Sequence, residues 1–472
     1  MSNKAVIDKY RGNGFVSGSK YIRCPSGVER FGLQPVPVQL RQGGIWPLFN
    51  IFSNLFINPG TLITSGMMIM AGLSFQATVL LQIFSVMLGM IPFLLFARAG
   101  VRYGIPGQVL CRAVFGVRGS QWLTSVLRLL CSIYWFAFQT AAGALAIEAI
   151  LRNCFQLFLP LWVISLNFAL FQGVVAIVGY SWLKGVSLVS FPLKVLCFSA
   201  LLVFLYQHGG EEASISVVLE WPGYHWHWPL IATWLNTIVS TCFTCVTDAS
   251  DFSRYTRSEK SLWVGTLSGS LVGIIIGALF GAYAVVAGGA VSINPFETIT
   301  RLQPGGLVIL LIMLVIFLDN WTINVINLYT GGLSLCNSVE WLGRFWATVI
   351  VVLAASVLAC FPFLINQYSE VMGSIGALFA PISGVMLVWY YYEFSRLDLA
   401  ALYQKNGAYW YCKGFNVFAC LLAPVGLLFS FCLPVTVLPA LLIMFLTSLI
   451  YWFYARRELH GYSGEQRYLN RN

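Results

Sequence analysis

Apolar stretches long enough to cross a lipid bilayer recur along almost the whole of this sequence. Each runs for about 20 residues, the length of helix that the hydrocarbon core of a bilayer requires. Only 9% of the residues are charged, against about a quarter in soluble domains, so the composition excludes a water-soluble fold. The sequence predicts an all-α membrane protein with twelve transmembrane helices, at 46–72, 75–97, 121–150, 157–180, 186–207, 229–250, 262–288, 305–328, 345–366, 371–393, 415–432 and 435–455.

The basic residues are distributed unevenly between the two sides of this predicted bundle. If the N-terminus is cytoplasmic, cytoplasmic segments hold 23 of the 27 Lys and Arg residues, and external loops hold only Arg152 and Arg301. Basic loops stay in the cytoplasm, so both termini are predicted there. The same rule explains the net charge of +10 without nucleic acid as a partner. We therefore expect a multi-pass protein of the cell (inner or plasma) membrane, with the lipid bilayer as its surroundings.

Helix breakers indicate where a binding site is expected, because many transporters bind substrate where broken helices expose backbone groups. Pro59 and Gly60 lie inside the first span, where they loosen the preceding turn, although a simple kink is an equal alternative. The sixth span lacks Gly and Pro after Pro229 but is polar from Asn236 to Asp248, which also suits packing between helices. The separation of five spans predicts a five-plus-five inverted repeat followed by two C-terminal helices.

This arrangement divides the chain into six segments. The polar first segment lacks the short apolar core of a signal peptide, so residue 1 is expected to belong to the mature protein. The predicted segments are a cytoplasmic tail (1–45), the first repeat (46–207), an external loop (208–228), the second repeat (229–393), a cytoplasmic loop with spans 11 and 12 (394–455) and a cytoplasmic tail (456–472).

Several short motifs occur in the order typical of one transporter family. The stretch 112–119 (RAVFGVRG) precedes the third span, and the others are 34–37 (QPVP), Trp135-Phe136 with Gln139, 251–255 (DFSRY), 321–324 (WTIN) and Pro381 with Gly384-Val385. In these motifs, over about residues 30–455, the chain resembles the nucleobase:cation symporter family of purine, cytosine, allantoin and hydantoin permeases. The resemblance implies a leucine-transporter-type fold and a secondary transporter that imports a nucleobase or related heterocycle by alternating access.

A flat heterocycle needs aromatic surfaces for stacking and amides for its polar rim. Trp135 and Gln139 share one helix face at i, i+4, although a packed Trp and an interhelical Gln would have the same spacing. The resemblance implies a stacking Trp and a hydrogen-bonding Gln there, and it matches Phe243 to a second stacking aromatic, the alternative being an ordinary core or lipid-facing Phe. The predicted substrate-binding residues are Trp135, Gln139, Phe243, Asn324, Asn327 and, beside the first break, Asn58.

The coupling ion is predicted from two groups of residues. By resemblance, the carbonyls of Ser53 and Phe56 and the hydroxyl of Thr322 would bind Na⁺, but Ile323 stands where the cytosine permeases have a second Thr. Lys194 and Asp319 lie well inside apolar runs, and ionised residues there usually pair and mark ion or proton paths. We hypothesise that Lys194 replaces the sodium ion, so that coupling is to H⁺ or absent. A structural ion pair, or a lysine that reaches the interface, is an equal alternative.

Two other functions compete with this prediction. A transporter of the same fold could carry amino acids or another small solute, with a pocket suited to a zwitterion instead of a stacked ring. A membrane-embedded enzyme is not expected, because the spans contain no metal triad, nucleophile–base pair or phosphate loop. No metal site and no cofactor beyond the coupling Na⁺ or H⁺ is predicted.

Overall fold

A computed structural model of the chain describes residues 31–176, 180–361 and 363–461. Within these residues all elements of regular secondary structure are helices, joined by turns and three isolated β-bridges. The predicted all-α fold is therefore confirmed. The predicted tails (1–45 and 456–472) and the end of the predicted span 157–180 lie partly outside the described residues.

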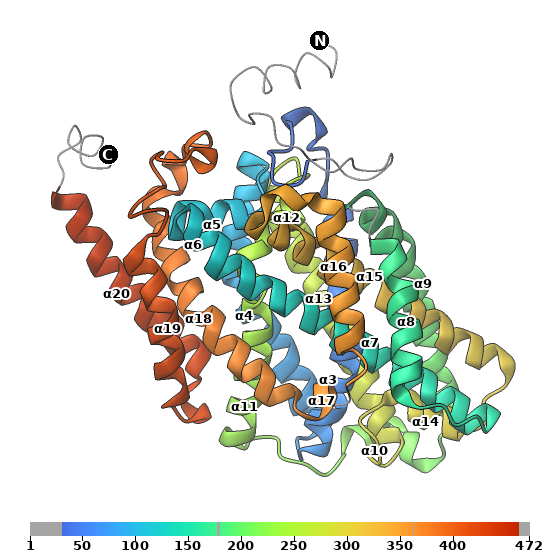
Figure 1. Cartoon of the computed structure of the whole chain (residues 1–472). Helices are drawn as coiled ribbons and strands as arrows, with labels where there is room; N and C mark the ends of the chain where they lie inside the picture. The colour runs from blue at the N-terminus through green and yellow to red at the C-terminus, as the bar shows by residue number, and fades with distance from the viewer. Residues whose placement is uncertain (1–30, 177–179, 362, 462–472) are drawn as a thin grey trace.

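The α-helices run lengthwise between two ends of the molecule, with short helices at both ends (Figure 1). Their bounds are α2 Ile45–Phe56, α3 Pro59–Met70, α4 Phe75–Tyr103, α5 Gly107–Phe115, α6 Val117–Gly119, α7 Ser125–Phe155, α8 Leu161–Ala176, α9 Tyr180–His208, α10 Ile215–Leu219, α11 Trp228–Phe243, α12 Ala249–Ser253, α13 Glu259–Ala287, α14 Pro295–Arg301, α15 Gly306–Ser338, α16 Gly343–Leu358, α17 Phe363–Asn366, α18 Tyr368–Glu393, α19 Val417–Phe431 and α20 Pro439–Gly461. Single turns of other helix types are η1 Val38–Leu40, η2 Ser120–Thr124, η3 Glu211–Ala213, η4 Val246–Asp248, η5 Glu340–Leu342, η6 Phe394–Arg396, η7 Ala401–Tyr403 and η8 Val435–Val437.

Nine helices of the described chain are long and apolar enough to cross a membrane. They coincide with nine of the predicted spans. The other three predicted spans fall on shorter apolar helices, namely Ile45–Phe56 together with α3, Leu161–Gly173 and Val417–Phe431. Pro59 and Gly60 thus divide the first span into two shorter helices, as expected from the loss of backbone hydrogen bonds.

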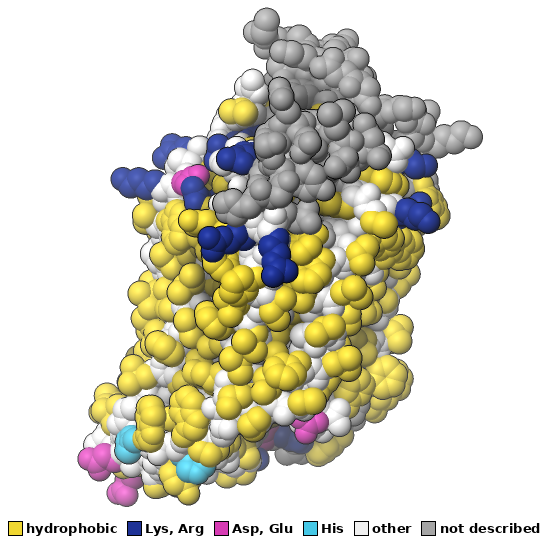
Figure 2. All heavy atoms as spheres, turned by 90° about the vertical axis from the view of Figure 1, so that its left-hand side faces the viewer, with side chains coloured by type: hydrophobic (Ala, Val, Ile, Leu, Met, Phe, Trp, Pro, Cys, Tyr) yellow, Lys and Arg dark blue, Asp and Glu magenta, His cyan; other side chains and the backbone are white. Residues whose placement is uncertain are grey.

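The surface of the bundle is apolar around its middle. Figure 2 shows a hydrophobic band over the face that carries α18, α19 and α20, with most of the visible Lys and Arg at one end and most of the visible Asp, Glu and His at the other. Side chains such as Leu428 and Phe445 are more than half exposed. Exposing such an apolar surface to water is unfavourable, whereas exposing it to lipid is not. The described chain begins and ends at the basic end of this face (Figure 1).

Helix α13 packs closely on the interrupted first span. Five of its glycines recur every fourth residue and face α2 and α3; they are Gly265, Gly269, Gly273, Gly277 and Gly281. A Cβ atom added at Gly273 would lie 2.5 Å from the Ser53 carbonyl oxygen, closer than any side chain tolerates. Small residues at this spacing let the backbones of two membrane helices approach. The stripe therefore holds α2 and α3 in fixed positions beside the cavity described below.

Candidate functional site: a cavity between two helix breaks

The first span is interrupted between α2 and α3, as the Pro-Gly pair predicts. Helix α2 ends at Phe56 and α3 begins at Pro59, a first-turn position for which proline is suited. The Asn58 side chain caps α3, since its oxygen accepts a hydrogen bond from the Thr61 amide at 3.0 Å. Its amide nitrogen also donates to the Leu55 carbonyl at 2.6 Å. Asn58 therefore stabilises both sides of the break.

The sixth span is also interrupted, although it has neither Gly nor Pro at that point. Helix α11 ends at Phe243, the chain turns through Thr244 and Cys245, and the short elements η4 and α12 follow. Residues at both breaks line one cavity: they are Leu55, Phe56, Asn58, Gly60 and Thr61 at the first break, and Thr241, Cys242, Thr244 and Cys245 at the second. The sequence showed the polarity of the sixth span but did not predict a break in it.

The cavity has an empty volume of about 800 Å³, including the part open to solvent. Its lining comes from α2, α3, α4, α7, α11, α13, α15 and α18, and all of the lining residues are uncharged. One wall is apolar, with Val86, Met90 and Phe93 of α4. The polar groups of the lining belong to Asn58, Thr61, Thr64, Gln82, Gln139, Thr241, Thr244, Asn327 and Tyr368. Such a pocket suits a neutral ligand with an apolar body and a few polar positions.

Trp135 and Gln139, predicted to bind substrate, both line the cavity from α7. The Trp135 indole nitrogen donates a hydrogen bond to the Thr244 hydroxyl oxygen at 3.2 Å. The Gln139 side-chain oxygen accepts one from the Gly60 amide at 2.8 Å. Each residue is therefore anchored to one of the two breaks. Among the described residues nothing accepts from the Gln139 amide nitrogen, which leaves this donor for a ligand.

Asn324 and Asn327 occupy different positions although both were predicted to bind substrate. Asn327 lines the cavity, whereas Asn324 is not part of the lining. The Asn324 amide nitrogen donates to Thr140 Oγ1 at 3.1 Å, and its oxygen accepts from Asn327 Nδ2 at 3.2 Å. Asn324 thus fixes the orientation of Asn327. Within the described chain no group donates to the Asn327 amide oxygen, so this oxygen is an available acceptor.

Phe243 is fully buried and lies outside the lining, in contact with the hydrophobic core. Its neighbours Cys242 and Thr244 line the cavity. Successive helical residues point about 100° apart, so a ring one position along α11 points away from the cavity. The structure does not bring Phe243 together with Trp135 and Gln139.

The aromatic ring of the lining that contacts Trp135 is Tyr368, the first residue of α18. Its ring centroid lies 6.4 Å from that of Trp135 with an angle of 68° between the planes, and it stacks on Phe138 at 4.7 Å. Its hydroxyl is 3.4 Å from Thr241 Oγ1. Tyr368 was not among the predicted substrate-binding residues, because the predicted tenth span began at 371. An aromatic residue with a hydroxyl, just before that span, was the signal that could have found it.

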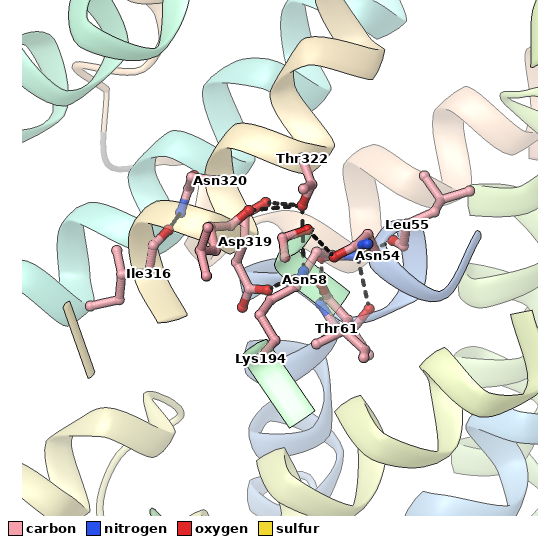
Figure 3. Close-up of polar contacts among 12 residues, drawn as sticks. Asn54, Leu55, Asn58, Thr61, Lys194, Ile316, Asp319, Asn320 and Thr322 are labelled. Carbon is pink, nitrogen blue, oxygen red and sulfur yellow. Dashed lines mark hydrogen bonds and ion pairs between the residues drawn. The ribbon is translucent and has the colours of Figure 1, made fainter. Parts of the chain in front are cut away.

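A buried ion pair adjoins the first break, behind the cavity wall (Figure 3). Lys194 Nζ of α9 lies 2.7 Å from Asp319 Oδ1 of α15, and both side chains are at most 1% exposed. The same ammonium group donates to the Ile57 carbonyl at 3.1 Å and to Thr322 Oγ1 at 3.4 Å. The pairing that the sequence suggested is therefore present, and Lys194 connects the interrupted first span with α15.

The other residues predicted for cation coupling lie around this lysine. The Ser53 carbonyl accepts the amide hydrogen of Ile57 at 2.9 Å, as the last hydrogen bond of α2. Phe56 lines the cavity. The Thr322 hydroxyl donates to the Leu318 carbonyl at 2.9 Å or the Asp319 carbonyl at 3.0 Å. Among the described residues no group of three or more His, Cys, Asp or Glu residues could hold a metal ion.

These features define a class of protein: a helical membrane transporter with an uncharged pocket between two interrupted spans. A family model described as a permease for cytosine/purines, uracil, thiamine and allantoin matches residues 35–454. The chain belongs to this family, and the family resemblance seen in the sequence motifs is thereby confirmed. It is a multi-pass membrane protein of the permease type.

Curated relatives and solved structures agree with this assignment. The chain is 28% identical over 375 residues to the hydantoin permease of Microbacterium maritypicum, a match covering 75% of this chain and 72% of that protein. It is 24% identical over 360 residues to the allantoin permease of Bacillus subtilis (strain 168), covering 70% and 72%. The fold is similar to that of the nucleobase-cation-symport-1 family transporter Mhp1 in a closed conformation with bromovinylhydantoin bound, with a TM-score of 0.78 and 20% identity over 94% of this chain and 99% of that one.

Proposed function

We propose that this protein imports a neutral, flat heterocycle of the nucleobase or hydantoin class by alternating access. The observation that carries the proposal is the lining of the cavity, which combines aromatic rings, among them Trp135 and Tyr368, with amide groups and contains no charged side chain. Trp135 offers a face for stacking, and Tyr368 closes one side of it. Gln139 supplies a donor and Asn327 an acceptor for the rim of the ring. Asn58 supports the site by holding the first break.

The relatives' names are consistent with this substrate class. A hydantoin permease and an allantoin permease are both similar to this chain, and hydantoins and nucleobases share a planar ring with alternating N–H and C=O groups. The present pocket has one available donor and one available acceptor at Gln139 and Asn327, which matches such an edge. Import, as opposed to export, is part of the proposal and is measured by the uptake experiment below.

We further propose the finer architecture expected from the sequence: twelve spans, five-plus-five inverted repeats at 46–207 and 229–393, and cytoplasmic termini. Two observations support it. The breaks in the first and sixth spans both line the cavity, as paired broken helices of inverted repeats do. The Lys and Arg residues gather at the end where the described chain begins and ends (Figures 1 and 2), which agrees with the positive-inside rule.

For the coupling ion we propose that the Lys194 ammonium takes the place of a sodium ion. It donates to a carbonyl of the first span and a hydroxyl of α15, which are the hard oxygen ligands that a cation would need there. A second cation next to this ammonium would be repelled at short range. Asp319 neutralises the lysine at 2.7 Å, so protonation of the carboxylate would release it. Coupling is then to H⁺ or absent.

The competing function is a carrier for amino acids. A bound zwitterion needs partners for its carboxylate, typically the free amides at a helix N-terminus. In this structure the Gly60 amide donates to Gln139 and the Thr61 amide donates to Asn58. With these donors engaged and no charge in the lining, the heterocycle is the better-supported substrate.

Uptake into proteoliposomes tests the proposal. A panel of radiolabelled hydantoin, allantoin, cytosine, uracil and hypoxanthine is compared with alanine and leucine, for wild type and Trp135→Ala. We expect saturable uptake of at least one heterocycle, lost in the variant, and none of the amino acids. Uptake of an amino acid alone would replace this proposal with the competing one.

A further inference from the structure

The break in the sixth span lacks the residues that usually interrupt a helix, so its stability needs another source. Helix α11 stops at Phe243 inside an apolar segment that continues to Ser253. In a membrane interior, freed backbone carbonyls require partners from elsewhere in the protein. One such partner is Arg128 of α7, whose Nη1 donates to the Thr244 carbonyl at 3.0 Å.

Arg128 binds three groups with its guanidinium. Its Nε lies 2.9 Å from Asp248 Oδ2, where the chain resumes a helical turn after the break. Its Nη2 donates to Thr330 Oγ1 of α15 at 2.9 Å. The side chains of Arg128 and Asp248 are 1% and 0% exposed. The planar fork of arginine suits this arrangement, because its two terminal nitrogens donate to Thr244 and Thr330 while the charge stays beside Asp248.

Thr244 connects this cluster to the substrate pocket. Its carbonyl accepts from Arg128, while its hydroxyl oxygen accepts from the Trp135 indole. Arg128 and Trp135 are seven residues apart on α7, which places them on one face of the helix. Trp135 and Thr244 line the cavity, whereas Arg128 and Asp248 do not.

We infer that Arg128, together with Asp248, is a positioning residue for substrate binding: it fixes the break of the sixth span and, through Thr244, sets the orientation of the stacking ring of Trp135. The effect of Arg128 on substrate binding rests on the transport function proposed above. Its role in supporting the helix break is independent of that function. A movement of the sixth span that shifts Thr244 either shifts the Trp135 indole with it or breaks their hydrogen bond, so binding and helix rearrangement are linked at one residue.

Hydrogen–deuterium exchange of the full-length protein in nanodiscs tests the first part without a substrate. In Arg128→Gln, and in the charge-neutral pair Arg128→Gln/Asp248→Asn, we expect the amides of 244–248 to exchange about tenfold faster than in wild type. Arg128→Lys keeps the charge but loses the planar fork of donors, so its exchange rates should lie between those of wild type and Arg128→Gln. Arg152→Gln is the matched control on the same helix, at its far end, and should leave these amides unchanged. Unchanged exchange in the neutral pair would overturn the inference.

Transport kinetics test the link to Trp135. Thr244→Val removes the hydroxyl acceptor of the indole but keeps the carbonyl that Arg128 binds. With the panel compound that wild type takes up fastest, we expect this variant to raise KM about five- to tenfold. The Arg128→Gln/Thr244→Val double variant should have the KM of Arg128→Gln within about twofold, because both changes release the same ring. Effects on KM that multiply would contradict the link. If wild type transports no panel compound, the proposed function fails, and the exchange result still decides the role of Arg128.

Discussion

Each of the two helix breaks is accompanied by a buried cation with a closely similar set of partners. Lys194 binds the Asp319 carboxylate, the Ile57 carbonyl at the first break and the Thr322 hydroxyl. Arg128 binds the Asp248 carboxylate, the Thr244 carbonyl at the second break and the Thr330 hydroxyl. Both threonines belong to α15, so this helix supports both clusters.

The cations differ in one respect that matters for transport. A lysine can lose its proton and an arginine cannot, because arginine stays charged throughout the physiological range. The Lys194 cation can therefore be neutralised during a transport cycle, whereas the Arg128 cation keeps its charge. On this account the first break is the site of ion coupling and the second is a permanent support for the substrate pocket.

The largest expected effect is the loss of stability when the carboxylate is removed from one cluster or the other. Asp248→Asn leaves the Arg128 charge buried without a counterion, and removing one partner of a buried pair costs about 3 to 5 kcal/mol. Asp319→Asn should cost less, since Lys194 can shed its proton and still donate to Ile57. Thermal unfolding of the two purified variants at neutral pH measures the difference. A larger loss of Tm in Asp319→Asn would reverse the comparison.

Removing the stacking surface should affect substrate without affecting ion dependence. Stacking of a base on an aromatic side chain is worth about 1 to 3 kcal/mol, so Trp135→Ala should weaken binding by about 5- to 150-fold. Trp135→Phe keeps an aromatic ring but loses the hydrogen bond to Thr244, so it should lose less binding affinity than Trp135→Ala. Equilibrium binding of a transported panel compound gives the values, and equal affinities for the wild type and Trp135→Ala would remove Trp135 from the site.

A smaller effect distinguishes the two asparagines on α15. Asn327→Ala removes a hydrogen-bond acceptor from the lining, and we expect KM to rise about tenfold, as for loss of one buried hydrogen bond. Asn324→Ala only frees Asn327 to reorient and should raise KM less. Uptake kinetics of both variants decide the order. If Asn324→Ala were the more damaging, Asn324 would be the residue that contacts substrate.

The smallest effect is expected at Phe243. Its side chain is fully buried outside the cavity, so Phe243→Leu should change KM by no more than about twofold while lowering stability, because a large ring is lost from the core. Tyr368→Leu, on the cavity wall, is the matched variant and should raise KM more. A KM effect of Phe243→Leu equal to that of Tyr368→Leu would return Phe243 to the binding site.

The sequence predicted those features that depend on local chemistry. Pro59 and Gly60 interrupt a helix wherever they occur within it, and two charges inside apolar runs have few partners other than each other, so the first break and the Lys194–Asp319 pair could be foreseen. The family motif containing Trp135 and Gln139 pointed to two residues that do line the cavity.

The features that were missed depend on contacts between distant helices. The carbonyl at the second break accepts a hydrogen bond from an arginine of α7, 116 residues away in the chain. No Gly or Pro near Thr244 indicates a break in the sequence. Whether Phe243 or its neighbour faces the cavity depends on the rotation of α11, which its packing against α4 and α18 decides. Tyr368 enters the lining only because the start of α18 reaches the cavity.

Uptake under imposed gradients is the sharpest test of the proposal that Lys194 takes the place of a sodium ion. Wild-type proteoliposomes are given an inward Na⁺ gradient, an inward H⁺ gradient or neither, with K⁺ replacing Na⁺ as the control, and Asp319→Asn is measured in parallel. We expect uptake to be the same with Na⁺ and K⁺, and any stimulation by the H⁺ gradient to disappear in Asp319→Asn. Uptake that strictly requires Na⁺ would contradict the account.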